Sequence, residues 1–292
     1  MTLAASEETQ KRDPRQLSQL ALTAWEMEQE PVGAGDARSR SSLLRAHARL
    51  QAEIEAVTGI VADQRSRLRV RDDAEEGVLL IHGSTGSPAD LAGLAEHLFD
   101  SGFQVYSMLL PGHGTGTEGL PTVMWKSCLN EVSLRYRILS RACRRVHVVG
   151  FSFGAALAIL LTQNEHPSTL SLLAPALVPK VTFWTRLMIA LGLHRLPVLR
   201  RRIGWNLEVF EAMEKAKGQI GKLKLPVYAA HCEDDERIDA ASLRHLQKKV
   251  HNKSSRFRLY QTGGHMILEA HGPSSLHGEV LQFIRTKPRQ HS

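Results

Sequence analysis

The sequence has few cysteines and lacks any long apolar run. Only three of its 292 residues are cysteines, too few and too widely spaced for a disulfide framework or a cysteine-based zinc site. No segment approaches the ~18 consecutive apolar residues that a membrane-spanning helix requires. Near the start of the chain, Lys11, Arg12 and Asp13 interrupt any apolar stretch of the kind found in a secretory signal. We therefore expect a cytoplasmic protein that is neither disulfide-stapled nor membrane-spanning.

The composition is that of a folded protein. Hydrophobic residues make up 42% of the chain and charged residues 23%, which excludes a chain that is disordered throughout. The length fits one large domain, or one domain with extensions, and suffices to bury a core without covalent staples. The 37 basic and 30 acidic residues give a formal net charge of +7, whose location along the chain decides its meaning.

Short apolar runs alternate with helical patterns from Leu68 onward. The strand-like runs cover residues 78–81, 103–109, 146–149, 170–174, 226–230 and 256–260. Helical spacing of apolar residues separates most of them, over residues 88–101, 123–141, 154–164 and 240–250. This alternation predicts an α/β fold with a mostly parallel central sheet and helices on both faces.

Two segments depart from this alternation. Residues 1–66 show apolar residues at helical spacing and predict a helical extension, with a Gly-, Ala-, Ser- and Arg-rich linker at residues 31–42. Residues 175–225 contain no convincing strand and predict a helical cap between the two parts of the core, residues 67–174 and 226–292. Inserted helices after a strand of such a sheet lie over the carboxyl edge, where ligands bind.

The strongest chemical signal is Gly150-Phe151-Ser152-Phe153-Gly154. It lies between a predicted strand and a predicted helix, the context in which G-x-S-x-G forms a nucleophile elbow. Flanking glycines permit the sharp turn, and the helix N-terminus favours negative charge developing beside the serine. An isolated G-x-S-x-G is usually an ordinary turn, so the prediction depends on this placement.

A serine nucleophile needs a base and an orienting acid. The loop after the fifth strand-like run contains Glu233, Asp234 and Asp235, and the loop after the sixth contains His265 behind a pair of glycines. Both loops follow strands that end at the same sheet edge as Ser152. Most acidic clusters and most of the fourteen histidines are expected to be solvated or packed, but three loops converging on one edge favour a catalytic site. Position alone leaves the choice of acid open.

The oxyanion of acyl transfer requires two backbone N–H donors. Phe153, directly after the candidate nucleophile, is expected to supply one. The loop after the first strand-like run reads His82-Gly83-Ser84-Thr85-Gly86, and we expect the Ser84 amide to be the second donor. The loop is also compatible with a plain Gly-rich turn, but it lacks the G-x-x-x-x-G-K-[ST] pattern of a nucleotide-binding P-loop.

Together these motifs resemble the α/β-hydrolase superfamily, and within it the branch of small bacterial carboxylesterases and monoacylglycerol lipases (serine aminopeptidase-like). The resemblance covers about three quarters of the chain, and residues 1–66 have no counterpart in it. Besides the elbow, it rests on His82-Gly83, Pro111-Gly112-His113-Gly114, Asp235-Glu236-Arg237-Ile238 and Gly264-His265. Two departures are Cys232, where the family usually has Gly, and Cys128, where an acidic residue commonly follows Trp125.

The resemblance selects Asp235 as the acid, because the acid of this family usually stands three residues before a Val or Ile, here Ile238. Asp234 is the alternative. The family's Pro-Gly-His-Gly loop shapes the site and does not perform the chemistry. The predicted substrate-binding residues are His82, Gly83, His113, Phe151, Trp184 and Met188.

The implied reaction is hydrolysis of short or medium acyl esters or monoacylglycerols through an acyl-enzyme. His265 would act as the base for Ser152, with Asp235 fixing its tautomer, and no metal or cofactor is needed. The same triad also serves thioesterases, amidases or peptidases, and C–C hydrolases, which the sequence does not separate. A dehalogenase would have aspartate at the elbow, and a non-catalytic binding protein would have an eroded triad; both are disfavoured.

The net charge of +7 is located in the predicted cap. Residues 175–225 contain ten basic and three acidic residues, whereas the rest of the chain is balanced at 27 of each. Beside Trp184 and Trp205, such a surface favours an anionic membrane surface or anionic acyl substrates, with a solvated basic face as the alternative. Nucleic acid is not expected, because no binding motif is present and the charge lies beside a predicted hydrolase cleft.

Overall fold

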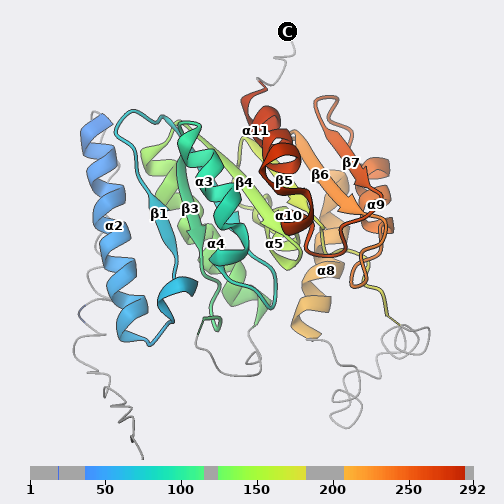
Figure 1. Ribbon diagram of the computed structural model, residues 1–292, viewed down its shortest axis with the longest axis horizontal. Coiled ribbons are helices and arrows are strands. Elements are labelled where there is room, and N and C mark those ends of the chain that lie inside the picture. Colours follow the sequence, from blue (N-terminus) through green and yellow to red (C-terminus); the bar gives the residue numbers. More distant parts are fainter. Residues whose placement is uncertain (1–18, 20–36, 115–123, 182–206, 287–292) are drawn as a thin grey trace, which may run out of the picture.

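Seven strands form a single sheet in the computed structural model, which describes residue 19 and residues 37–114, 124–181 and 207–286 (Figure 1). The strand order is β1-β3-β2-β4-β5-β6-β7. β1 is antiparallel to β3, and every other neighbouring pair is parallel. The predicted α/β fold with a mostly parallel sheet is confirmed.

The strands lie close to the predicted runs. Their bounds are β1 Arg67–Arg69, β2 Glu76–Ile81, β3 Gln104–Met108, β4 Arg145–Phe151, β5 Thr169–Leu173, β6 Val227–Cys232 and β7 Arg256–Tyr260. The sequence predicts the central strands well because both of their faces are buried, which produces nearly continuous apolar runs. β1 was not predicted, since Arg-Leu-Arg is too short and too polar to give a strand pattern.

Helices cover both faces of the sheet. They are α2 Ala37–Val57, α3 Ala92–Asp100, α4 Trp125–Ala142, α5 Phe153–Leu161, α8 Leu207–Gln219, α9 Ala241–Lys249, α10 Ile267–His271 and α11 Gly278–Arg285. Short 3-10 segments occur at η1 Ala62–Gln64, η2 Pro88–Leu91 and η4 Ile220–Lys222, and a π-helical turn at η5 Gly272–His277. Leu79 and Ile81 of β2 pack with α4, α5 and α8 on one face, and Val78 and Leu80 pack with α3, α10 and α11 on the other.

α5 is the most enclosed helix, and all nine of its residues are buried. It leads directly out of β4 and packs against α4 and α8. α8 lies within the predicted cap, residues 175–225, yet its Val209, Ala212 and Met213 belong to the hydrophobic core. This helix therefore anchors the segment to the body of the fold. Trp184 and Met188, which were predicted to bind substrate, lie outside the described residues.

The long N-terminal helix α2 packs against α4 and β1. Because α2 begins at Ala37, the expectation of a linker that continues to residue 42 is wrong. Ala and Arg residues in this stretch favour a helix. Ser41 is buried there, and its hydroxyl donates a hydrogen bond to Arg71 O at 3.1 Å. Further along α2, His47 accepts a hydrogen bond from Arg135 of α4 at 3.0 Å. Burial, together with the charge of Arg135, lowers the pKa of His47 to about 3. A neutral imidazole thus joins the extension to the core.

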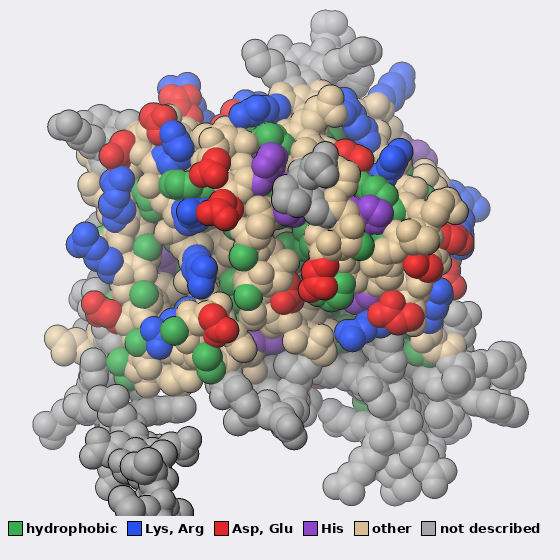
Figure 2. All heavy atoms as spheres, viewed as in Figure 1, with side chains coloured by type: hydrophobic (Ala, Val, Ile, Leu, Met, Phe, Trp, Pro, Cys, Tyr) green, Lys and Arg blue, Asp and Glu red, His purple; other side chains and the backbone are tan. Residues whose placement is uncertain are grey.

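Two observations bear on the predicted contact with a membrane surface. None of the helices in the described ranges is long and apolar enough to cross a membrane. Figure 2 shows acidic and basic side chains interspersed on the face viewed in Figure 1, with no large patch of one sign. The basic excess assigned to residues 175–225 falls partly on residues that the structure does not describe.

Candidate active site

Ser152 occupies the sharp turn between β4 and α5. Its φ of 53° and ψ of −115° place a non-glycine residue in a sparsely populated backbone region. Both flanking glycines are required by close backbone approach: a Cβ on Gly150 would lie 2.4 Å from Gly154 O, and one on Gly154 would lie 2.2 Å from Ile81 O. Ser152 N also donates to Leu173 O at 2.9 Å. The G-x-S-x-G pattern is thus a packing requirement of this turn.

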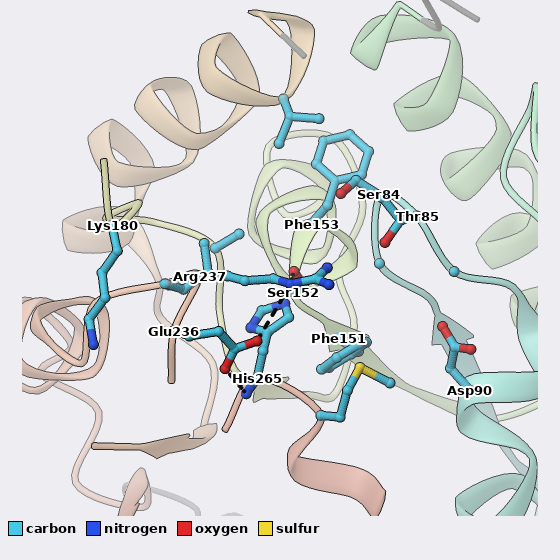
Figure 3. Close-up of a pocket in the computed structure, with 16 residues that line it drawn as sticks. Ser84, Thr85, Asp90, Phe151, Ser152, Phe153, Lys180, Glu236, Arg237 and His265 are labelled. Atoms are coloured by element: carbon cyan, nitrogen blue, oxygen red, sulfur yellow. Dashed lines mark hydrogen bonds and ion pairs between the residues drawn. The ribbon is translucent and has the colours of Figure 1, made fainter. Parts of the chain in front are cut away.

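Ser152, His265 and Asp235 form a continuous hydrogen-bonded chain. Ser152 Oγ lies 2.9 Å from His265 Nε2 (Figure 3). On the other side of the ring, His265 Nδ1 lies 2.8 Å from Asp235 Oδ2. The three residues follow β4, β7 and β6, which are parallel and therefore end at the same edge of the sheet. Gly263 and Gly264, with φ of 130° and 61°, turn the loop that presents His265.

Asp235 is fully buried, and its surroundings favour the ionised form. Its Oδ1 accepts hydrogen bonds from Arg237 N at 2.8 Å and Ile238 N at 2.9 Å. Burial alone would raise the pKa of Asp235, but hydrogen bonds from His265 and these two amides outweigh it and lower the pKa overall. An ionised carboxylate only accepts, so His265 Nδ1 carries a proton and Nε2 is left to accept from the Ser152 hydroxyl.

The neighbouring acidic residues bind other parts of the His265 loop. Asp234 accepts from the amides of Gly264 at 2.9 Å and Gly263 at 3.2 Å, and Glu236 Oε2 accepts from His265 N at 3.1 Å. Of the four consecutive acids Glu233–Glu236, only Asp235 is hydrogen-bonded to the imidazole. Asp234, the alternative acid, instead binds the glycine turn.

A second buried imidazole lies behind the acid. His231, at the end of β6, is fully buried, and its Nε2 lies 3.1 Å from Ile238 O and 3.5 Å from Asp235 Oδ2. Burial lowers the pKa of His231, although the Ile238 carbonyl and the charge of Asp235 act in the opposite direction. The ring supports the turn that presents Asp235. Sequence reasoning missed it, because its one signal was a place at the end of a strand.

The two residues expected to supply amides to the oxyanion, Ser84 and Phe153, line the same cavity as Ser152 (Figure 3). Phe153 opens α5, and the first amides of a helix have no intrahelical acceptor. Gly83, which precedes Ser84, packs so closely on Ser152 that a Cβ there would lie 3.3 Å from Ser152 Cβ.

His82 and His113 hold this loop from behind and do not appear in the described cavity wall. His82 is fully buried; Leu110 N donates to its Nε2 at 3.0 Å, so Nδ1 carries the proton and donates to Gly83 O at 2.7 Å. Burial, then the nearby His113, lowers the pKa of His82 to about 3. His113 Nε2 lies 2.9 Å from Ser84 O. Both rings thus position the Gly83–Ser84 backbone.

A cavity of about 590 Å³ opens in front of Ser152 and His265. Its apolar wall is formed by Phe151, Phe153, Ala176, Val209, Ile238 and Met266. Its charged side chains are Asp90, Lys180, Glu236 and Arg237. Gly83 and Phe151, two of the residues that the sequence predicts to bind substrate, line this cavity. The Phe151 ring lies against His265, with the ring centroids 5.4 Å apart. Within the described residues, no group of three His, Cys, Asp or Glu side chains is arranged to hold a metal ion.

Comparison with known proteins identifies a matching family and a partly matching relative. The family model described as "Alpha/beta hydrolase family" matches residues 78–271. A thermostable monoacylglycerol lipase from Bacillus sp. (strain H-257) is 35% identical over 91 residues, which cover 31% of this chain and only 36% of that relative.

The solved structures share the fold at low sequence identity. A chain from LipS and LipT, metagenome-derived lipolytic enzymes, superposes with a TM-score of 0.66 at 17% identity, covering 77% of this chain and 99% of its own. A monoacylglycerol lipase from Paleococcus ferrophilus superposes with a TM-score of 0.60 at 19% identity, covering 71% and 93%. With the family model matching more than half of its length, this chain belongs to the alpha/beta hydrolase family.

Proposed function

We propose that this protein is a serine hydrolase of carboxylic esters, with Ser152 as nucleophile, His265 as general base and acid, and Asp235 as the residue that orients His265. The observation that carries the proposal is the hydrogen-bonded chain of these three side chains, which starts at a strained turn and faces a cavity. Such an arrangement is how a weakly nucleophilic hydroxyl is activated at neutral pH.

Each proton has a defined place in the proposed reaction. His265 Nε2 accepts the Ser152 proton as Oγ attacks the acyl carbon, and the ionised Asp235 stabilises the resulting imidazolium. The amides of Ser84 and Phe153 stabilise the oxyanion. The imidazolium then gives its proton to the departing alkoxide, which leaves as an alcohol. Water attacks the acyl-enzyme while His265 removes its proton, and Ser152 regains a proton as the carboxylic acid leaves.

The cavity supports esters with an apolar acyl portion. Six of its lining side chains, including Phe151 and Phe153 on either side of Ser152 in the sequence, are apolar. Relatives named as monoacylglycerol lipase and lipolytic enzymes agree with this chemistry. We therefore propose short or medium acyl esters, including monoacylglycerols, as the substrate class.

The test is hydrolysis of p-nitrophenyl esters of two to twelve acyl carbons by wild type and Ser152→Ala. We expect wild-type turnover with an optimum of chain length and a loss of kcat/KM of about 10⁴-fold or more in the variant, because no other group can form the acyl-enzyme. A fluorophosphonate should label wild type at Ser152 only. Matching p-nitroanilides, which present an amide, should react far more slowly.

Thr162→Val is the matched control, since it also removes a hydroxyl but lies at the far end of α5. Its kcat/KM should stay within about 3-fold of wild type, as for substitutions outside the site. If folded wild type hydrolyses none of the esters and is not labelled at Ser152, the proposed function is wrong. Faster cleavage of the anilides would point to an amidase.

A further inference from the structure

The active-site cavity carries two cationic side chains on one wall. Lys180 and Arg237 belong to neighbouring extended segments that are hydrogen-bonded to each other: Lys180 N donates to Arg237 O at 2.8 Å, and Asp239 N donates to Val178 O at 2.8 Å. An isolated bridge joins Pro179 and Ile238 between them. The backbone therefore places these two residues beside each other, and both line the cavity.

Arg237 is tied to the catalytic geometry through its backbone. Its amide donates to Asp235 Oδ1 at 2.8 Å, so any displacement of Arg237 is coupled to the proposed catalytic acid. Its side chain extends across the cavity toward Ser152 in Figure 3. An ionic group of a substrate bound at Arg237 would thus lie in the same cavity as the reacting ester bond.

The guanidinium is only partly neutralised. Glu236 Oε1 lies 3.6 Å from Arg237 Nε, while Glu236 Oε2 accepts from His265 N at 3.1 Å. Within the described residues, neither the Arg237 guanidinium nor the Lys180 ammonium donates a hydrogen bond, and Lys180 has no ion-pair partner. The N–H groups of the guanidinium are therefore available to a ligand.

The remaining carboxylate of the cavity does not compensate these cations. Asp90 lies across the cavity from Lys180 in Figure 3, and its Oδ2 accepts from Ser87 N at 3.3 Å within a capping box. The cavity therefore presents Lys180 and Arg237, together with Glu236, on the side opposite Asp90.

We propose that the cavity selects esters whose acyl chain ends in a carboxylate, that is, monoesters of dicarboxylic acids, with Arg237 as the carboxylate receptor and Lys180 as a supporting cation. The planar guanidinium fork matches the two oxygens of a carboxylate, a pairing that a point charge cannot reproduce. The apolar wall accommodates the methylene chain that separates the carboxylate from the ester bond. This proposal rests on the proposed ester hydrolysis.

The test uses two p-nitrophenyl esters of nearly equal shape. The hemiglutarate carries a terminal carboxylate, and the 5-methylhexanoate carries an isopropyl group in its place. Wild type should prefer the hemiglutarate in kcat/KM. Arg237→Gln should lower the ratio of kcat/KM on the hemiglutarate to kcat/KM on the neutral ester by about 10- to 100-fold, the range for a hydrogen bond to a charged group. Arg237→Lys should retain part of the preference, and Lys180→Gln should lose less than Arg237→Gln.

Arg244→Gln is the charge-matched control. Arg244 pairs with Glu233 and Asp239 at 3.5 Å and does not line the described cavity, so its substitution should leave the ratio of the two substrates unchanged. A wild type that hydrolyses both esters without preference, or an Arg237→Gln variant that loses both equally, would overturn the carboxylate proposal and leave ester hydrolysis standing. Absence of activity on either ester would instead count against the proposed function.

Discussion

Two hydroxyl–imidazole–carboxylate chains lie at opposite ends of β4. The chain at the carboxyl edge of the sheet consists of Ser152, His265 and Asp235. The chain at the amino edge consists of Thr169, His147 and Glu76, with Thr169 Oγ1 2.8 Å from His147 Nδ1 and His147 Nε2 3.1 Å from Glu76 Oε2. Both imidazoles are buried, with 5% and 1% of their surface exposed. Distance and burial alone therefore do not distinguish the two.

The backbone geometry and the accessibility of the hydroxyl group distinguish the two chains. Ser152 stands at a turn with positive φ and lines a cavity of about 590 Å³. Thr169 is the first residue of β5, paired in register with His147, and is only 2% exposed. An acyl carbon can approach the serine hydroxyl but not a threonine hydroxyl enclosed between strands. The chain at the amino edge is thus structural.

The carboxylates also differ in how they are held. Asp235 accepts two backbone amides, which leaves its second oxygen for His265. Glu76 pairs with both His147 and Arg145, so its charge is balanced by a cation of the neighbouring strand. An orienting acid must keep its charge for the imidazolium that forms during the reaction, whereas a structural carboxylate is best neutralised permanently.

The largest expected contrast comes from removing each imidazole. His265→Ala should lower kcat/KM on p-nitrophenyl esters by about 10⁴-fold or more, because the nucleophile loses its base. His147→Ala should keep kcat/KM within about 3-fold and instead lower the free energy of unfolding by about 1–3 kcal/mol, because Thr169 and Glu76 each lose their hydrogen bond to the imidazole. Steady-state kinetics and urea unfolding of both variants measure the two effects.

Folded His265→Ala with near-wild-type turnover would contradict the assignment of the base. A large loss of turnover in His147→Ala, at full stability, would show that the chain at the amino edge contributes to catalysis. Circular dichroism of both variants establishes that the comparison is made between folded proteins.

The sequence predicts most of the sheet because its central strands are buried on both faces. β2, β4 and β5 consist largely of consecutive apolar residues, and each was located to within about two residues. The three-residue β1 carries no such pattern, and the start of α2 was hidden because its buried positions include a serine. Local patterns thus locate elements that bury apolar side chains and miss those that bury polar ones.

For the site, the sequence predicts which loops converge but not which atoms meet. Asp234, Asp235 and Glu236 all bind the His265 loop, and only the turn geometry decides which carboxylate faces the ring. His82 was expected to contact substrate, yet its two nitrogens are both used by backbone groups. Such roles depend on side-chain direction across loops distant in sequence, which no spacing encodes.

A smaller difference in kcat/KM is expected between two variants in which one of the adjacent aspartates, Asp235 or Asp234, is replaced by asparagine. Asp235→Asn should lower kcat/KM by about 10³- to 10⁴-fold, because an asparagine can donate to His265 Nδ1 and hold the wrong tautomer. Asp234→Asn should lose less than about 10-fold, because its side-chain oxygen can still accept from the amide of Gly264. Kinetics of the two variants at pH 7 on one ester make the comparison. Equal losses would show that the whole acidic loop, and not Asp235, orients the imidazole.

The smallest effect concerns the pH dependence of the amino-edge chain. The hydrogen bond from His147 lowers the pKa of Glu76 below its usual value of 4.5, against the opposing effect of burial and with help from Arg145. As the pH falls through 4.5, the unfolded chain therefore binds a proton before the folded protein does, and the stability that ionised Glu76 contributes is lost. Glu76→Gln should be about 1 kcal/mol less stable than wild type at pH 7, and this difference should shrink below pH 4.5.

Urea unfolding at pH 7, 5 and 4 measures the difference, with Glu75→Gln as the control. Glu75 lies next in the chain, is more exposed and pairs with Arg144 at 3.5 Å, so its variant should differ little from wild type at any of these pH values. A stability loss in Glu76→Gln that is the same at pH 7 and pH 4 would mean that the carboxylate charge does not hold this chain together. The stability contribution of Glu76 would then come from hydrogen bonds that a neutral side chain can also make. Glu76 would in that case differ from Asp235, whose proposed role requires the negative charge.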